Sequence, residues 1–137
     1  MSSKGGSRTK ARKRALDILF EADLCETSAR DVLADHIAAA DPPVREYTAE
    51  LVAGVLEHAD TIDEQITAHL PEGWTLQRMP RVDRNVARIA VYEFAAGGVE
   101  RAVAIAEAVA LAADLSTDES PAFLNGVLAG IAQGLVE

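Results

Sequence analysis

Apolar residues recur at helical spacing in seven segments of this chain. In the first segment they occupy Ala11, Ala15, Ile18, Leu19 and Ala22, which share one face of an α-helix. The same spacing predicts helices over residues 9–24, 28–40, 41–55, 61–70, 81–94, 103–115 and 121–136. No segment is a candidate β-strand. The pattern therefore predicts an all-α fold, a compact single-domain bundle of about seven helices.

Residues with known capping preferences indicate where several of these helices begin. Ser28, followed three residues later by Asp31, resembles a capping box. Asp41 is expected to cap the third helix, because the two prolines that follow it are tolerated in a first helical turn. Residues 71–80 are predicted to form an irregular connector, with Trp74 covering the core.

Two later helices are expected to pack closely against their neighbours. The segment 81–94 is apolar around much of its circumference, which predicts a central, buried helix. Arg88 in this helix is expected to pair with Glu93 or Glu107, since a buried guanidinium requires a carboxylate. Glycine recurs at every fourth position of the last helix, at Gly126, Gly130 and Gly134. That spacing predicts the close approach of a neighbouring helix.

The composition agrees with a helical domain. Of the 137 residues, 49% are hydrophobic and only 4% aromatic, which favours helices packed through small side chains. The chain has neither a long apolar run nor an apolar signal segment at its start, so we expect a cytoplasmic protein without a membrane span. One cysteine and three scattered histidines suggest neither a disulfide nor a metal site. No catalytic constellation is recognisable, so we expect a protein that is not an enzyme and needs no cofactor.

Charge is distributed very unevenly along the chain. The first 14 residues contain six basic side chains and no acidic ones, whereas the remainder contains seven basic and 22 acidic side chains. A basic segment on an acidic body is suited to hold phosphate, above all that of nucleic acid. We therefore predict a flexible basic arm over residues 1–8 and a single helical RNA-binding domain over residues 9–137. A solvated start without a ligand is the alternative.

Three segments together resemble the NusB family of transcription antitermination factors. They read ARKRALDILFE at 11–21, VDRNVARIAVYE at 82–93 and SPAFLNGVL at 120–128. Their order and separation also match, so the resemblance covers nearly the whole chain. It implies a helical protein that pairs with the ribosomal protein NusE and binds the single-stranded boxA element of nascent RNA. The complex is then expected to join RNA polymerase and other Nus factors, and to keep elongation through ribosomal RNA operons resistant to termination.

The resemblance also implies RNA contacts at ten positions. The arginine-rich start of the family falls on five cations that are expected to contact phosphate, namely Arg8, Lys10, Arg12, Lys13 and Arg14. The other five are an aromatic of the first helix, an acid that opens the central helix, and the loop and aromatic before Asn-Gly: Phe20, Asp83, Glu119, Ser120 and Phe123. Such a set suits single-stranded RNA, which offers phosphates to cations and unstacked bases to flat or hydrogen-bonding groups.

Two residue roles and two other functions stay open. For Asp83 the alternatives are to accept a hydrogen bond from a base, to cap its helix or to contact the protein partner. For Phe123 the alternatives are to stack on a base or to pack in the core. The same helical fold occurs as the N-terminal domain of certain ribosomal RNA cytosine methyltransferases, but nothing in this sequence supplies their catalytic domain. A protein-interaction module is the second alternative, in which the basic arm and acidic body of two copies pair in a homodimer.

Overall fold

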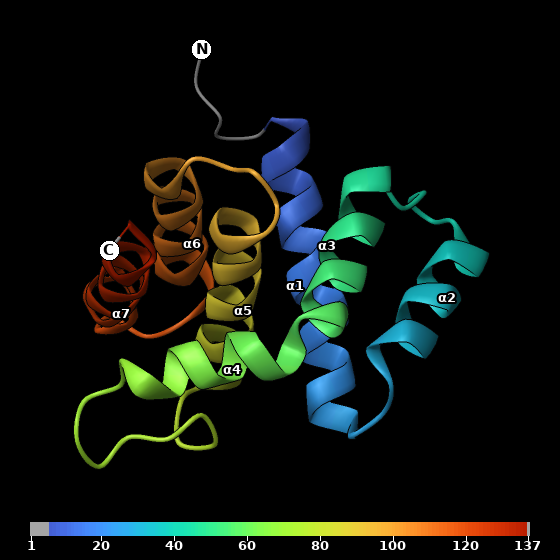
Figure 1. The fold of residues 1–137 in the computed structure, drawn as a ribbon. Helices are drawn as coiled ribbons and strands as arrows, with labels where there is room; N and C mark the ends of the chain where they lie inside the picture. Colours follow the sequence, from blue (N-terminus) through green and yellow to red (C-terminus); the bar gives the residue numbers. More distant parts are fainter. Residues whose placement is uncertain (1–5, 137) are drawn as a thin grey trace.

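The computed structural model describes residues 6–136, which form seven α-helices and no β-strand (Figure 1). The helices are α1 (Ser7–Cys25), α2 (Ala29–Ala39), α3 (Glu46–Glu57), α4 (Ala59–Ala68), α5 (Arg81–Ala95), α6 (Arg101–Leu115) and α7 (Ser120–Val136). The predicted all-α fold is confirmed. Residues 1–5 of the predicted basic arm, which include Lys4, lie outside the described residues, and α1 already contains Arg8.

The helix starts agree with the sequence pattern except at α3. The Ser28 hydroxyl accepts a hydrogen bond from the Arg30 amide at 3.2 Å, so the predicted cap of α2 is confirmed. The predicted cap at Asp41 is wrong, because α3 begins at Glu46 with Arg45 at its N-cap. The cause is the proline pair at 42–43, since a residue that precedes proline is disfavoured in the helical region.

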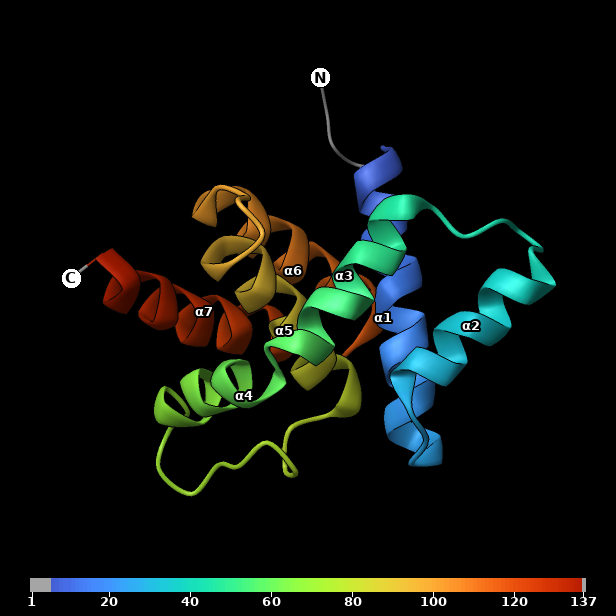
Figure 2. The same cartoon turned by 45° about the vertical axis from the view of Figure 1, so that its right-hand side comes forward.

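Helix α5 lies at the centre of the bundle and packs against α1, α3, α4, α6 and α7 (Figures 1 and 2). It runs antiparallel to α1. Arg12 near the start of α1 meets Glu93 near the end of α5, and Asp23 near the end of α1 meets Arg84 near the start of α5. Helix α2 packs on α1 and α3, away from α6 and α7. The prediction of a central helix over 81–94 is confirmed.

The connector between α4 and α5 covers the core with residues other than Trp74. Met79 is 2% exposed, and Leu76 packs against the buried cluster. The Trp74 side chain is 44% exposed. Trp74 lies in a turn, where its backbone amide donates to the Pro71 carbonyl at 3.0 Å. The expectation that Trp74 covers the core is therefore wrong.

The glycines of α7 do not mark a close helix contact. A β-carbon at Gly126 or Gly134 would meet no atom within 4 Å, and one at Gly130 would meet the His69 ring at 3.2 Å. The residues that α7 buries lie on its other faces, at Leu124, Val127, Leu128, Ile131 and Ala132. The predicted approach of a neighbouring helix backbone to this glycine face is wrong.

One buried ionic network joins four helices. Arg12 of α1 is 3% exposed, and its guanidinium donates to Glu93 of α5 at 2.9 and 3.0 Å and to Glu107 of α6 at 3.1 Å. The Tyr47 hydroxyl of α3 also donates to Glu93. Burial raises the pKa of Glu93, and hydrogen bonds and charge from Tyr47 and Arg12 oppose that increase. The network fixes the rotation of α1 against the bundle.

Replacing Arg12 by methionine should strongly destabilise the protein. The substitution leaves two buried carboxylates without their cation, so we expect the free energy of unfolding to fall by about 3–5 kcal/mol. Chemical denaturation measures this change. Lys13→Met is the matched control, because the Lys13 side chain is 53% exposed and its pair with Asp17 is long; it should change stability by at most about 0.5 kcal/mol. Equal losses in the two variants would show that the network does not hold α1.

Candidate nucleic-acid interface

The first turns of α1 carry accessible positive charge. Lys10 and Lys13 are exposed and lie three residues apart, which places them on the same side of the helix. The Lys13 ammonium is 3.5 Å from the Asp17 carboxylate, and both side chains are about half exposed. An exposed pair of this kind is weak. Both ammonium groups therefore stay accessible to a phosphate.

Two further arginines of this segment contact neighbouring parts of the protein. The Arg8 guanidinium lies 4.3 Å from the centre of the Tyr47 ring, an arrangement that allows a cation–π contact. Arg14 donates to His36 Nδ1 at 3.1 Å and to the Pro42 carbonyl at 3.2 Å. These contacts direct Arg8 towards α3, and Arg14 towards α2 and the link that follows it.

Arg12 is not available to a phosphate in this structure. Its guanidinium is enclosed by the carboxylates of Glu93 and Glu107, so the phosphate contact expected at this position does not fit the observed geometry. The sequence contains a signal for this burial. Arg12 lies four residues before Leu16 and seven before Leu19, so it belongs to the apolar stripe of α1 and not to its exposed side.

Phe20 extends the exposed side of α1 beyond the lysines. It follows Lys13 by seven residues, which returns it to nearly the same side of the helix, and it is partly buried. Leu24, one turn later, is 51% exposed. We call Lys10, Lys13, Phe20 and Leu24 the α1 strip. It offers cations at one end and apolar surface at the other, as an unstacked RNA strand requires.

Asp83 and Ser120 are brought together at the start of α7. The Asp83 carboxylate accepts from the Ser116 hydroxyl at 2.5 Å and from the Ser120 hydroxyl at 2.8 Å. Asp83 and Ser120 are each 2% exposed. Helix α5 has Pro80 at its N-cap and no capping side chain, so Asp83 ties the loop between α6 and α7 to α5 instead of capping its own helix.

Phe123 has both of the environments that the sequence left open. Its ring packs against the buried cluster, yet it remains partly exposed. The ring centre of Trp74 lies 5.5 Å away, with the ring planes inclined by 47°. The Phe123 amide donates to the carbonyl of Glu119, whose side chain is exposed. The hydrogen bonds of Ser120 therefore position both Glu119 and Phe123.

The predicted contacts form two groups at opposite ends of the α1–α5 pair. Arg12 meets α5 at Glu93, and Ser120 meets it at Asp83. Ten residues of helix separate these two levels, or about 15 Å along the axis. The α1 strip spans the distance between them. A ligand that touches both groups must therefore be extended.

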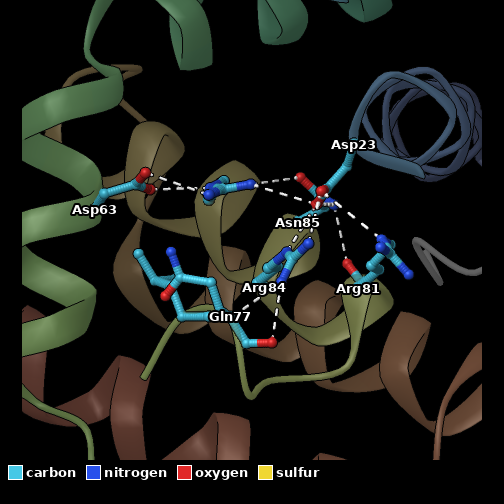
Figure 3. Close-up of polar contacts among 8 residues, drawn as sticks. Asp23, Asp63, Gln77, Arg81, Arg84 and Asn85 are labelled. Atoms are coloured by element: carbon cyan, nitrogen blue, oxygen red, sulfur yellow. Dashed lines mark hydrogen bonds and ion pairs between the residues drawn. The ribbon is translucent and has the colours of Figure 1, made fainter. Parts of the chain in front are cut away.

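Asp23 organises a polar network that the sequence analysis did not find (Figure 3). Its carboxylate accepts from Arg84 at 2.6 and 2.7 Å and from Asn85 at 2.9 Å. Arg81 and Arg88 each place a guanidinium nitrogen 3.8 Å from it. The hydrogen bonds from Arg84 are the main cause that lowers the pKa of Asp23 below its usual value. Three arginines of α5 thus share one carboxylate of α1.

Arg88 also pairs with a different acid from the one predicted. Its guanidinium donates to Asp63 of α4 at 2.9 and 3.2 Å. Glu93 and Glu107 are both occupied by Arg12, which explains why the predicted pairing is wrong in its partner. The prediction that Arg88 forms a structural ion pair is confirmed.

Helices α3 and α4 form a surface of the opposite charge. Between residues 46 and 77 the chain has seven acidic side chains and no lysine or arginine. Five of these acids are exposed on the two helices, at Glu46, Glu50, Glu57, Asp60 and Glu64. We call them the acidic face. It repels RNA phosphates and favours a basic protein.

The described part of the chain contains no group of three or more His, Cys, Asp or Glu side chains arranged to hold a metal ion. Among residues 6–136, no helix combines the length and the apolar character needed to cross a membrane.

The comparisons with known proteins agree on one family. The model of the NusB family matches residues 9–133. A transcription antitermination protein NusB from Acidothermus cellulolyticus is 57% identical over 126 residues, which cover 91% of this chain and 86% of the relative. The fold is similar to NusB of T. maritima, with a TM-score of 0.80 and 29% identity. That match covers 92% of this chain and 90% of the T. maritima chain. It is also similar to a chain in the crystal structure of the antitermination factors NusB and NusE in complex with double-stranded RNA. That match has a TM-score of 0.82 and 25% identity, and it covers 93% of this chain and 96% of the other.

The Asp23 network should make stability depend on pH in the acid range. Because the folded-state pKa of Asp23 is lowered, its contribution is complete above the unfolded value of 3.8 and is lost as the pH falls through the folded value. Asp23→Asn should lower the free energy of unfolding by about 1–3 kcal/mol at neutral pH. The difference from the wild type should shrink below about pH 4. Denaturation of both proteins across this range measures it, with Asp17→Asn as the exposed control. A difference that is independent of pH would contradict this assignment.

Proposed function

The chain belongs to the NusB family, and from that premise we propose that it is a transcription antitermination factor. In this proposal it binds the single-stranded boxA element of nascent ribosomal RNA together with the ribosomal protein NusE, and supports processive elongation by RNA polymerase. The boxA element and the ribosomal RNA operons come from the resemblance of the three sequence segments. The observation that carries the RNA part is the α1 strip, where Lys10 and Lys13 stay accessible on an otherwise acidic protein.

The relatives support this function over the methyltransferase alternative. The curated relatives are named transcription antitermination proteins and are not named as enzymes. The match covers 86% and 96% of the length of two of them, so it is not a match to one domain of a larger enzyme. We propose that this chain, too, acts by binding and not by catalysis.

A solved neighbour and the charge distribution support the two partners. That neighbour contains NusB with NusE and double-stranded RNA. In this chain two exposed lysines lie on the α1 strip, whereas five exposed acids and no lysine or arginine lie on α3 and α4. Two surfaces of opposite charge allow RNA and a basic protein to bind at the same time. We propose that NusE occupies the acidic face.

The geometry suggests different roles for the ten predicted contact residues. Four exposed or partly exposed cations are assigned to phosphates, namely Arg8, Lys10, Lys13 and Arg14. Phe20 and Phe123 are assigned to bases, and the exposed carboxylate of Glu119 to a base amino group. We assign positioning roles to the buried members Arg12, Asp83 and Ser120, which orient α1 and the loop before α7.

The remaining parts of the proposal concern the wider complex. We propose that the RNA-bound pair joins RNA polymerase and other Nus factors, and that it acts in the cytoplasm, where a bacterial transcript is made. A homodimer that hides the α1 strip is the competing state. Because RNA and a second copy would then use the same surface, RNA should displace the second copy.

Salt dependence tests whether the lysines of the α1 strip contact RNA phosphates. With three to five contacts and a contribution of roughly −0.7 per neutralised phosphate, the slope of log affinity against log salt should be about −2 to −3.5. The double variant Lys10→Gln/Lys13→Gln should weaken binding and reduce the magnitude of the slope by about 1.4. Fluorescence anisotropy of a labelled boxA-like RNA measures both quantities.

The control pair Arg30→Gln/Arg101→Gln removes the same charge from exposed residues outside the α1 strip. It should leave the slope nearly unchanged. The same RNA annealed to its complement distinguishes single-stranded from double-stranded preference, and we expect the single strand to bind more tightly. Affinity that does not change with salt, or equal slopes in the two double variants, would refute the proposed phosphate contacts.

A further inference from the structure

Trp74 is a large aromatic residue whose position core packing does not explain. It lies in the connector between α4 and α5, and its side chain is 44% exposed. Leu76 and Met79 of the same connector cover the core. The indole meets the Phe123 ring, with the ring centres 5.5 Å apart and the ring planes inclined by 47°. An indole held in this way keeps ring surface for another planar group.

Two arginines follow Trp74 in the chain, at the end of the connector and at the start of α5. Arg78 is exposed, and its guanidinium donates to the Gly73 carbonyl at 2.8 Å, so it folds back to the residue next to Trp74. The Arg81 side chain, at the first residue of α5, is 45% exposed. Glu72, two residues before Trp74, and Glu119, whose carbonyl accepts from the Phe123 amide, are exposed acids of the same region. Residues 72–81 contain two arginines and one acid, whereas residues 46–71 contain six acids and no lysine or arginine.

The rings come from two segments that are fixed by separate contacts. Phe123 stands one turn into α7, whose first residue, Ser120, is held by Asp83. Trp74 is held by the turn from Pro71. Because both rings are positioned before any ligand arrives, stacking on them does not require the segments to be ordered first.

We propose that Trp74, together with Phe123, forms a stacking platform for a nucleobase of the bound RNA, with Arg78 contacting the adjacent phosphate. The inference rests on the proposed RNA-binding function and adds the connector to the interface. Aromatic side chains bind unstacked bases of any sequence through their π faces, and nearby cations hold the strand. RNA is favoured over a basic protein segment as the occupant because two exposed arginines, Arg78 and Arg81, follow Trp74 within seven residues, in contrast to the acidic face.

The platform lies at the opposite end of the molecule from the start of α1, where Figure 1 shows the connector and the start of α5. The α1 strip begins in the first turns of α1 and runs towards this end. Its apolar members, Phe20 and Leu24, are the ones closer to the platform along α1. An extended strand can therefore place phosphates on Lys10 and Lys13 and a base on Trp74.

The fluorescence of Trp74 provides a direct test, because it is the single tryptophan of the chain. A short single-stranded boxA-like RNA is titrated into the full-length protein at low salt, with emission corrected for absorption by the RNA. Stacking should quench the emission, and the quenching should saturate at the same RNA concentration as the anisotropy of labelled RNA. Saturated anisotropy without a change in emission would refute the platform while leaving the RNA-binding function intact. Absence of binding in both measurements would refute both.

Variants measured by anisotropy provide the second part of the test. Trp74→Ala should weaken RNA binding about 5- to 150-fold, which corresponds to 1–3 kcal/mol for one stacked base. Trp74→Phe should retain most of the affinity, because it keeps an aromatic face. Ile37→Ala is the matched control, since Ile37 is 51% exposed on α2, away from the platform, and it should bind as the wild type does. Thermal melts of all three verify that folding is preserved.

Two results would overturn the proposal. The first is equal RNA affinity for Trp74→Ala and Ile37→Ala. The second is Trp74 emission that changes when purified NusE is added but does not change when RNA is added. NMR, or quenching of the emission by iodide, would then measure whether NusE covers the Trp74 ring. That result would assign the rings to a protein contact.

Discussion

One guanidinium between two buried carboxylates sets the orientation of the first helix in this NusB family protein. Arg12 joins α1 to Glu93 of α5 and Glu107 of α6, and the Tyr47 hydroxyl connects α3 to the same site. A buried ion pair contributes little net stability compared with apolar packing, but losing one partner is costly. Its effect here is on orientation. With Arg12 turned inward, Lys10 and Lys13 must face outward, and the α1 strip follows from that rotation.

The same network explains how a protein of net charge −9 can present a surface suited to RNA. Arg12 satisfies two acids inside the bundle, and the three arginines of α5 gather around Asp23 and Asp63. These pairs place Arg12, Arg84 and Arg88 inside the protein, and the lysines among the described residues, Lys10 and Lys13, are both exposed on α1. The exposed acids of α3 and α4 are left without basic neighbours in their segment. In the proposed function, RNA and a basic protein therefore use separate surfaces of one small bundle.

Much of the fold, but less of the site, could be predicted from the sequence. Helical periodicity is a property of each segment, so all seven helices and the central position of α5 were predictable. The partner of a charged residue depends on packing between distant segments. The sequence indicated that Arg88 would pair with an acid, but not that Arg12 would take Glu93 and leave Asp63 to Arg88. Asp83 and Trp74 show the same limit, because local sequence does not reveal that one is buried under two serines and the other is exposed.

RNA on the α1 strip and a basic protein on the acidic face should bind cooperatively. The most direct test is a thermodynamic cycle by calorimetry at one salt concentration. It compares the affinity of boxA-like RNA for the isolated chain with its affinity for the preformed pair with NusE. RNA should bind the pair more tightly by about 1–3 kcal/mol, and RNA must tighten the protein pair by the same amount. Equal RNA affinities in the two arms would show that the ligands bind independently and would contradict the account.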